Sequence, residues 1–220
     1  MKKLLFTLTL LFSLLSSAQE EIKYGINAGP TLSAIRGDGH AKDFTYAFGY
    51  MAGITIEKPL NQRFSFCAAI NYERKSSVQK TNYSYSDTII GPDGNPVDYT
   101  TEVDSKITTT LDYIVVPLNI KYYLDIYESY YVTGGGFAAY AFSDKYTVKG
   151  DAPTNGYQQD YKKMDYGLSL GFGTKFKLTR TQYLNIEIRD NFGVANITDI
   201  ESDKISTNSI SLIANWQFCP

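Results

Sequence analysis

The chain has 220 residues, of which 43% are hydrophobic and 15% are aromatic, and 19 residues are tyrosine. This length fits one domain, and all-β barrels of roughly this size are commonly single domains. The formal net charge of −2 argues against a general nucleic-acid binder, which would carry a basic excess. We therefore expect no nucleic-acid partner.

The first residues have the pattern of a cleaved secretory signal peptide. Two lysines form a basic start, the residues up to Leu15 are mostly apolar, and residues 16–18 (Ser-Ser-Ala) offer a small-residue cleavage site. The apolar run is shorter than the ~20 residues that a membrane-spanning helix needs, which disfavours an uncleaved anchor. We expect a signal peptide at 1–18 and one barrel domain at 19–220. That domain has 19 basic and 23 acidic residues and a net charge of −4.

Eight segments after the leader alternate apolar and polar residues with a period of two, which indicates β-strands with one apolar face. In chain order they are 22–33, 46–57, 63–75, 110–123, 130–142, 163–177, 183–194 and 205–218. The fifth is rich in glycine and alanine, so its facing is ambiguous. The sixth is the clearest, and its apolar face carries Met164, Tyr166, Leu168, Leu170 and Phe172.

The connections between these segments alternate in length. The short ones are 58–62, 124–129 and 178–182, and the long, polar ones are 34–45, 76–109, 143–162 and 195–204. In an even-stranded barrel with both termini on one side, all the long connections fall on the opposite side. This is the arrangement of outer-membrane barrels, which have short periplasmic turns and long external loops. We therefore predict an all-β fold, an eight-stranded antiparallel up-and-down transmembrane β-barrel in the outer membrane.

Periodicity alone leaves open which face points outward, since a soluble lipocalin-like barrel has its apolar face inside. Aromatic residues gather beside the short turns, where a membrane barrel has an interfacial girdle. The predicted girdle comprises Phe64, Tyr122, Tyr123, Tyr130, Tyr183, Trp216 and Phe218. The polar face of these segments, made of every second residue, combines small residues with acidic and basic ones. The interior of an eight-stranded barrel has room only for side chains. We therefore predict a filled polar lumen, whose candidate network is Lys121, Asp165, Lys175, Glu187 and Arg189.

The sequence predicts no catalytic, metal or cofactor site. The single histidine, His40, lies in a long loop, and nothing fixes it near a nucleophile. The acidic residues within 199–203 lack the spacing and the glycine of a calcium loop. A disulfide between Cys67 and Cys219 is disfavoured, because one cysteine is predicted at a strand centre and the other at the chain end.

Four segments carry motifs in an order typical of one family. They read AINYERKS at 69–76, LDYIVVPLNIKYY at 111–123, DYGLSLGFG at 165–173 and RDNFGVANI at 189–197. Together they resemble the strands of PorT-like outer-membrane β-barrel proteins, which are common in Bacteroidota. The chain departs from that pattern at Ala69, Ser76 and Asp190, where the family usually has glutamate, glycine and an aromatic residue. The resemblance implies the fold and the membrane, and it implies little about activity.

The leading functional hypothesis is a non-enzymatic barrel that is structural in the envelope or presents external loops to a partner. Loops on a rigid scaffold commonly bind, so 34–45, 76–109 and 143–162 are candidate sites for a protein or a surface ligand. The other expected partners are outer-membrane lipid and the barrel-assembly machinery. The alternatives are a small channel, a soluble periplasmic lipocalin-like binder and, least favoured, a barrel enzyme.

Overall fold

The structure is a computed structural model that describes residues 22–37, 44–90, 92, 95–150, 161–198 and 204–219. The predicted signal peptide and His40 lie outside the described residues. None of the described residues forms a helix, so this part of the chain has no helical segment that could cross a membrane.

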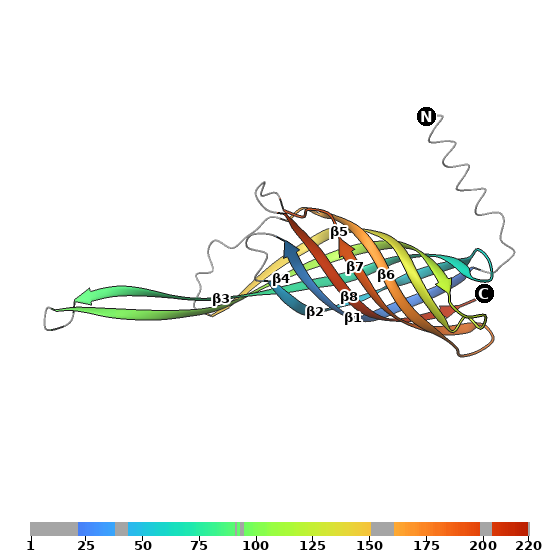
Figure 1. Cartoon of the computed structure of the whole chain (residues 1–220), viewed down its shortest axis with the longest axis horizontal. Helices are drawn as coiled ribbons and strands as arrows, with labels where there is room; N and C mark the ends of the chain where they lie inside the picture. The colour runs from blue at the N-terminus through green and yellow to red at the C-terminus, as the bar shows by residue number, and fades with distance from the viewer. Residues whose placement is uncertain are drawn as a thin grey trace, which may run out of the picture.

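Eight antiparallel strands close into one barrel (Figure 1). They are β1 (Lys23–Gly37), β2 (Phe44–Pro59), β3 (Phe64–Ile90), β4 (Pro96–Tyr123), β5 (Tyr130–Gly150), β6 (Met164–Lys177), β7 (Gln182–Gly193) and β8 (Ile205–Phe218). Each strand pairs with its neighbours in the chain, and β1 pairs with β8 to close the ring. The predicted up-and-down eight-stranded barrel is confirmed.

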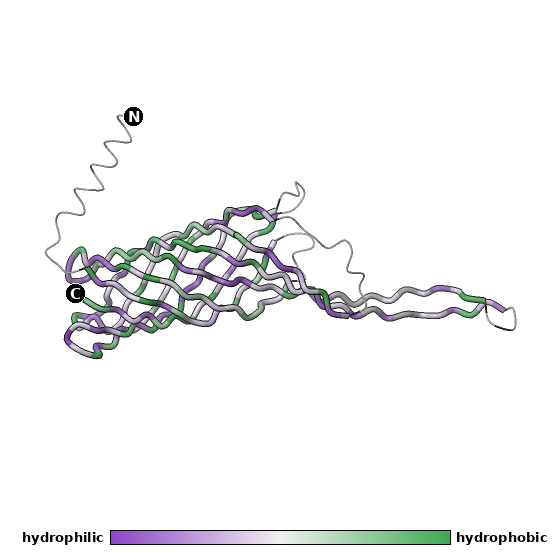
Figure 2. The backbone as a smooth tube through the Cα atoms, turned by 180° about the vertical axis from the view of Figure 1, so that it is seen from behind, coloured by the Kyte–Doolittle hydropathy of each residue, from purple (hydrophilic) through white to green (hydrophobic). Residues whose placement is uncertain are grey.

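On most strands the apolar face points outward and the polar face points into the lumen. β4 and β5 also turn apolar residues inward, where Leu111, Tyr113, Val115 and Phe137 form a buried cluster with two alanines. On β6, Leu170 is 63% exposed whereas Asp165 is fully buried. Figure 2 shows hydrophobic and hydrophilic residues interleaved along the barrel strands. Because leaving apolar area in water costs about 25 cal/mol per Å², this exterior requires lipid. The soluble lipocalin-like alternative is therefore wrong, since its apolar face would line the interior.

The short connections lie together at one end of the barrel. Two of them are tight turns, in which the amides of Leu60 and Leu178 donate to the carbonyls of Phe64 and Gln182 at 2.8 and 3.0 Å. In the turn between β4 and β5, the carboxylate of Asp125 accepts the backbone amides of residues 129 and 130 at 2.8 and 3.0 Å. The start of β1 and the end of β8 are at the same end, since Tyr24 pairs with Phe218.

The predicted loop at 76–109 is wrong, because β3 and β4 continue through it as a hairpin. Their register is unbroken from the pair Phe64↔Tyr122 to the pair Ile90↔Pro96. This hairpin projects far beyond the other strands (Figure 1). Its residues are rich in threonine, tyrosine and valine, which favour strands, and the Gly-Pro-Asp-Gly turn signal lies only at the tip. β5 likewise continues to Gly150, into the predicted loop at 143–162.

Candidate functional site

A buried carboxylate organises the lumen near the short turns. Glu57, at the end of β2, is 1% exposed. It accepts hydrogen bonds from Lys121, from the Tyr123 hydroxyl at 2.8 Å and from the Gln217 amide at 3.0 Å. The Lys23 ammonium adds a contact of 3.9 Å. A buried charge without partners is strongly destabilising. The three donors and the Lys23 ammonium come from three other strands, so these contacts tie the barrel wall together across its interior.

A second ion pair lies beside the first and comes from one strand. On β7, Arg189 Nε donates to Glu187 Oε1 at 2.6 Å, and the Thr133 hydroxyl donates to the same oxygen at 3.1 Å. Gly171 on β6 makes room for this carboxylate, because an added Cβ would lie 2.5 Å from Glu187 Oε1. The small residues of the polar face therefore leave space for long charged side chains from neighbouring strands.

The other two lumen pairs lie nearer the barrel ends. Asp165 on β6 accepts from Lys75 Nζ at 3.1 Å and from the Thr207 hydroxyl at 2.6 Å. Lys175 donates to Glu128, which lies in the turn between β4 and β5. Glu128 has a φ of 57°, a left-handed conformation that is uncommon for residues other than glycine. This pair lies at the short-turn end of the barrel.

The structure places all five predicted lumen residues on the inner face, in four separate ion pairs. Sequence reasoning missed three of their buried acidic and basic neighbours: Glu57, Glu73 and Lys75. Glu73 accepts a hydrogen bond from the Ser209 hydroxyl. All three lie on the polar face of their predicted strands, where they alternate with the apolar residues. This alternation was the signal that could have found them.

Five of the seven predicted girdle residues point outward: Phe64, Tyr122, Tyr130, Trp216 and Phe218. The Phe64 and Tyr122 rings are 4.8 Å apart. Two assignments are wrong, because Tyr123 and Tyr183 lie on the inward face of their strands. Tyr123 is 2% exposed and bonds Glu57, and the Tyr183 ring centre is 4.5 Å from the Lys175 ammonium. That the outward aromatic residues mark a lipid interface stays a prediction.

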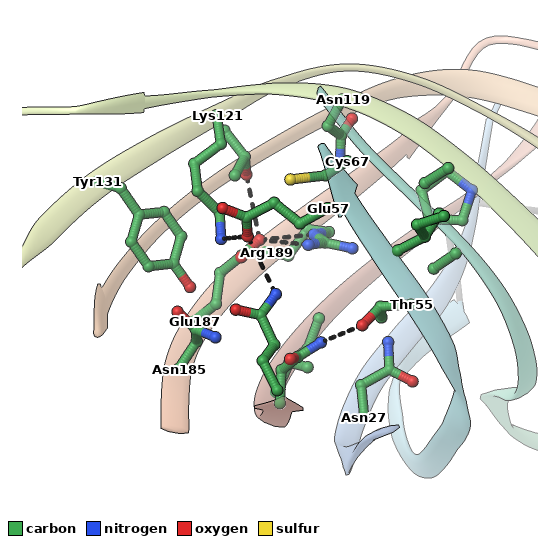
Figure 3. A pocket seen from close by; sticks show the side chains of 18 residues that line it. Asn27, Thr55, Glu57, Cys67, Asn119, Lys121, Tyr131, Asn185, Glu187 and Arg189 are labelled. Carbon is green, nitrogen blue, oxygen red and sulfur yellow. Dashed lines mark hydrogen bonds and ion pairs between the residues drawn. The ribbon is translucent and has the colours of Figure 1, made fainter. Parts of the chain in front are cut away.

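The lumen is closed by these side chains. The cavity between Glu57, Cys67, Asn119 and Asn185 (Figure 3) has a volume of about 30 Å³, which is room for about two water molecules. Both amide atoms of Asn185 lack a protein partner and suit bound water. Within the described ranges no cluster of histidine, cysteine and acidic residues could hold a metal ion, and both cysteines are unbonded. Among the described residues, the arrangement can hold the wall together and leaves little free space at this level of the lumen.

The second candidate site is the part of the hairpin that extends beyond the barrel, residues 80–104, called the ribbon below. β3 pairs with β2 only as far as Gln79, and β4 pairs with β5 only from Ser105. Beyond these points, within the described residues, the two strands pair with each other alone. Several of its apolar side chains are exposed; Ile89 and Tyr99, for example, are 53% and 59% exposed.

Known structures of similar shape are outer-membrane barrels. Neisserial surface protein A matches at 14% identity and a TM-score of 0.42, with 91% of this chain and all of that chain covered. The attachment invasion locus protein of Yersinia pestis matches at 12% identity and a TM-score of 0.40, with 90% of this chain and 100% of that chain covered. OprG from Pseudomonas aeruginosa matches at 13% identity and a TM-score of 0.37, with 91% of this chain and 98% of that chain covered. No curated protein matches the sequence.

The family model for the outer membrane protein beta-barrel domain matches residues 17–199, which is most of the chain. This match agrees with the closed eight-stranded barrel, the apolar exterior and the interior filled by side chains. The chain therefore belongs to the outer membrane protein beta-barrel domain family and is a protein of the outer membrane.

Proposed function

We propose that this protein is a non-enzymatic outer-membrane barrel that presents its ribbon to a partner outside the cell. The observation that carries the proposal is the length of β3 and β4, which run well past the last barrel pairs at Gln79 and Ser105. Burial of the barrel exterior in lipid does not need this extension. A rigid scaffold that holds an exposed element is a common arrangement for binding.

The small-channel alternative receives less support. The Glu57–Lys121 pair joins β2 to β4 inside the lumen, the Glu187–Arg189 pair of β7 lies beside it, and the cavity next to them has a volume of about 30 Å³. An ion that passed through would have to break these pairs. We therefore expect no steady conductance from the protein in planar bilayers.

The proposal includes four further assignments. The four strand motifs support a PorT-like relationship within the family, and the leader at 1–18 supports export by a signal peptide, with the barrel domain at 19–220. Insertion would then use the barrel-assembly machinery. The outward aromatic residues near the short turns support a girdle on the periplasmic side.

A deletion tests the proposed function. Residues 81–104 are removed and Thr-Asn-Gly joins Lys80 to Ser105. The inserted threonine then pairs with Ser105 as Thr81 does, and Asn-Gly forms the hairpin turn that keeps β3 and β4 in register. The control replaces residues 151–160, another part of a long connection, by a glycine-serine segment of equal length. Both variants should shift on gels after heating, as folded barrels do. Cross-linking on intact cells should recover a partner with the parent and the control and lose it with the ribbon deletion; an unchanged set of cross-linked proteins would contradict the proposal.

A further inference from the structure

We infer that the outer edge of β4 in the ribbon, residues 97–104, binds an extended basic segment of the partner as an added β-strand. The inference rests on the proposed function and names the chemistry of the partner. In such strand addition, main-chain hydrogen bonds give affinity and the alternating side chains give specificity.

The backbone of this edge is available for pairing. The last pair between β4 and β5 is Ser105↔Gly150, and towards the tip β4 pairs with β3 only, within the part of the chain that the structure describes. Alternate amides and carbonyls of a strand point to each side, so one set faces away from β3. An isolated two-stranded hairpin is at best marginally stable in water, and a third strand would stabilise it.

The edge lacks the features that usually prevent strand addition, which are internal prolines, lysines, bulges and short length. Proline occurs at Pro96, where β4 begins, and not within 97–104. No lysine lies within 97–104, and the β3–β4 register has no shift in the ribbon. Instead, the edge carries acidic residues, which repel acidic partners and attract basic ones.

The charge of the ribbon decides between a second copy of this chain and a basic partner. The ribbon, residues 80–104, includes five acidic residues and one basic residue, Lys80 at its base. Like charges on paired strands are destabilising, so two ribbons would repel each other. Three of the acids, Asp98, Glu102 and Asp104, are exposed on β4 itself. They are separated by even numbers of residues, so they share one face of the strand and suit lysine or arginine at alternate positions of the partner.

The opposite face of the edge is apolar near the tip. Val97 and Tyr99 are 49% and 59% exposed, and Ile89 pairs with Val97 across the ribbon. Cross-strand neighbours on one face interact directly. The matching partner therefore alternates basic and apolar residues.

A nine-residue peptide of alternating lysine and valine serves as the probe, titrated against the intact barrel in lipid nanodiscs at physiological salt. A second peptide of equal charge has prolines at two central valine positions, because proline cannot donate to a strand ladder. Two single charge reversals complete the design. Glu102→Lys lies on the proposed edge, and Asp87→Lys lies on β3 of the same ribbon.

We expect the alternating peptide to bind and the proline peptide to bind at least tenfold more weakly. Surface ion pairs contribute up to about 1 kcal/mol, so Glu102→Lys should weaken binding about fivefold and Asp87→Lys distinctly less. Equal binding of the two peptides, or equal effects of the two substitutions, would show attraction by charge alone and overturn the inference.

The peptide titration tests strand addition and the ribbon deletion tests the proposed function, so one claim can be wrong while the other holds. If neither peptide binds while deletion of 81–104 still removes the cross-linked partner, strand addition is wrong and the proposed function stands. If the deletion leaves the cross-linked partner in place, the proposed function itself is wrong.

Discussion

The two halves of β3 and β4 lie in contrasting surroundings although each strand is continuous. In the barrel, Lys121 is 3% exposed and bonded to Glu57 inside the lumen. In the ribbon, Tyr99 of the same strand is 59% exposed, and β4 has β3 as its one paired neighbour among the described residues. The barrel half therefore places polar residues among buried partners, and the ribbon half leaves its described residues largely exposed.

This difference indicates where substitutions act. A change in the lumen should alter the free energy of unfolding of the barrel, because its charges lie among partners from several strands. A change in the ribbon should alter recognition and leave the barrel intact. The following predictions test this division, from the largest effect to the smallest.

Lys121→Met should destabilise the barrel most. It removes the main partner of Glu57, and breaking a buried ion pair on one side costs about 3–5 kcal/mol. Urea unfolding of the protein in liposomes measures the loss. The double variant Glu57→Gln/Lys121→Met should recover part of it, since no charge is left without its partner. A loss below about 1 kcal/mol for the single variant would show that the pair is not structural.

Tyr123→Phe and Tyr122→Phe compare two adjacent residues on opposite faces. The Tyr123 hydroxyl donates to buried Glu57 at 2.8 Å, and hydrogen bonds to charged groups contribute about 1.5–3 kcal/mol. The Tyr122 hydroxyl accepts from Arg63 at 3.2 Å on the exposed outer side, and its loss should change the unfolding free energy by less than about 0.5 kcal/mol. Equal losses for the two variants would place both hydroxyls in the same environment.

Deletion of residues 81–104 should change the unfolding free energy of the barrel by less than about 1 kcal/mol, because an unsupported two-stranded ribbon is itself only marginally stable. The same urea titration measures it. A loss comparable with that of Lys121→Met would mean that the ribbon is part of the barrel's stability, and the contrast between the two halves would fail.

The Asp125 turn should show the smallest effect, a weak dependence on pH. Backbone amides of Tyr130 and Ser129 hold the pKa of this exposed carboxyl below its ordinary value of 3.8. Since the folded pKa is depressed, its contribution is present above that ordinary value and is lost as pH falls through the folded pKa. Carboxyl titration by NMR should find the lower pKa, and Asp125→Asn should remove this pH dependence. An ordinary pKa would contradict the capped turn.

The sequence predicted the barrel well because period-two alternation indicates strands and shows which residues share a face, while the connection lengths and the aromatic residues beside the short turns indicated which face is outward. The same parity would have placed Tyr123 and Tyr183 inside, but their position beside short turns suggested the girdle. The pairing of Lys75 with Asp165 could not be read from the sequence, because it joins residues 90 positions apart on strands that are not neighbours. The ribbon was missed because it has no continuous apolar face, and its strand signal was in threonine, tyrosine and valine.

Labelling of single cysteines on intact cells tests the central claim most directly. In a background with Cys67 and Cys219 replaced by serine, Tyr99→Cys lies on the ribbon and Asn61→Cys lies in a short turn at the opposite end. A membrane-impermeant maleimide should label Tyr99→Cys on intact cells and Asn61→Cys only after the outer membrane is permeabilised. The reverse pattern, with the turn labelled outside and the ribbon protected, would contradict the account.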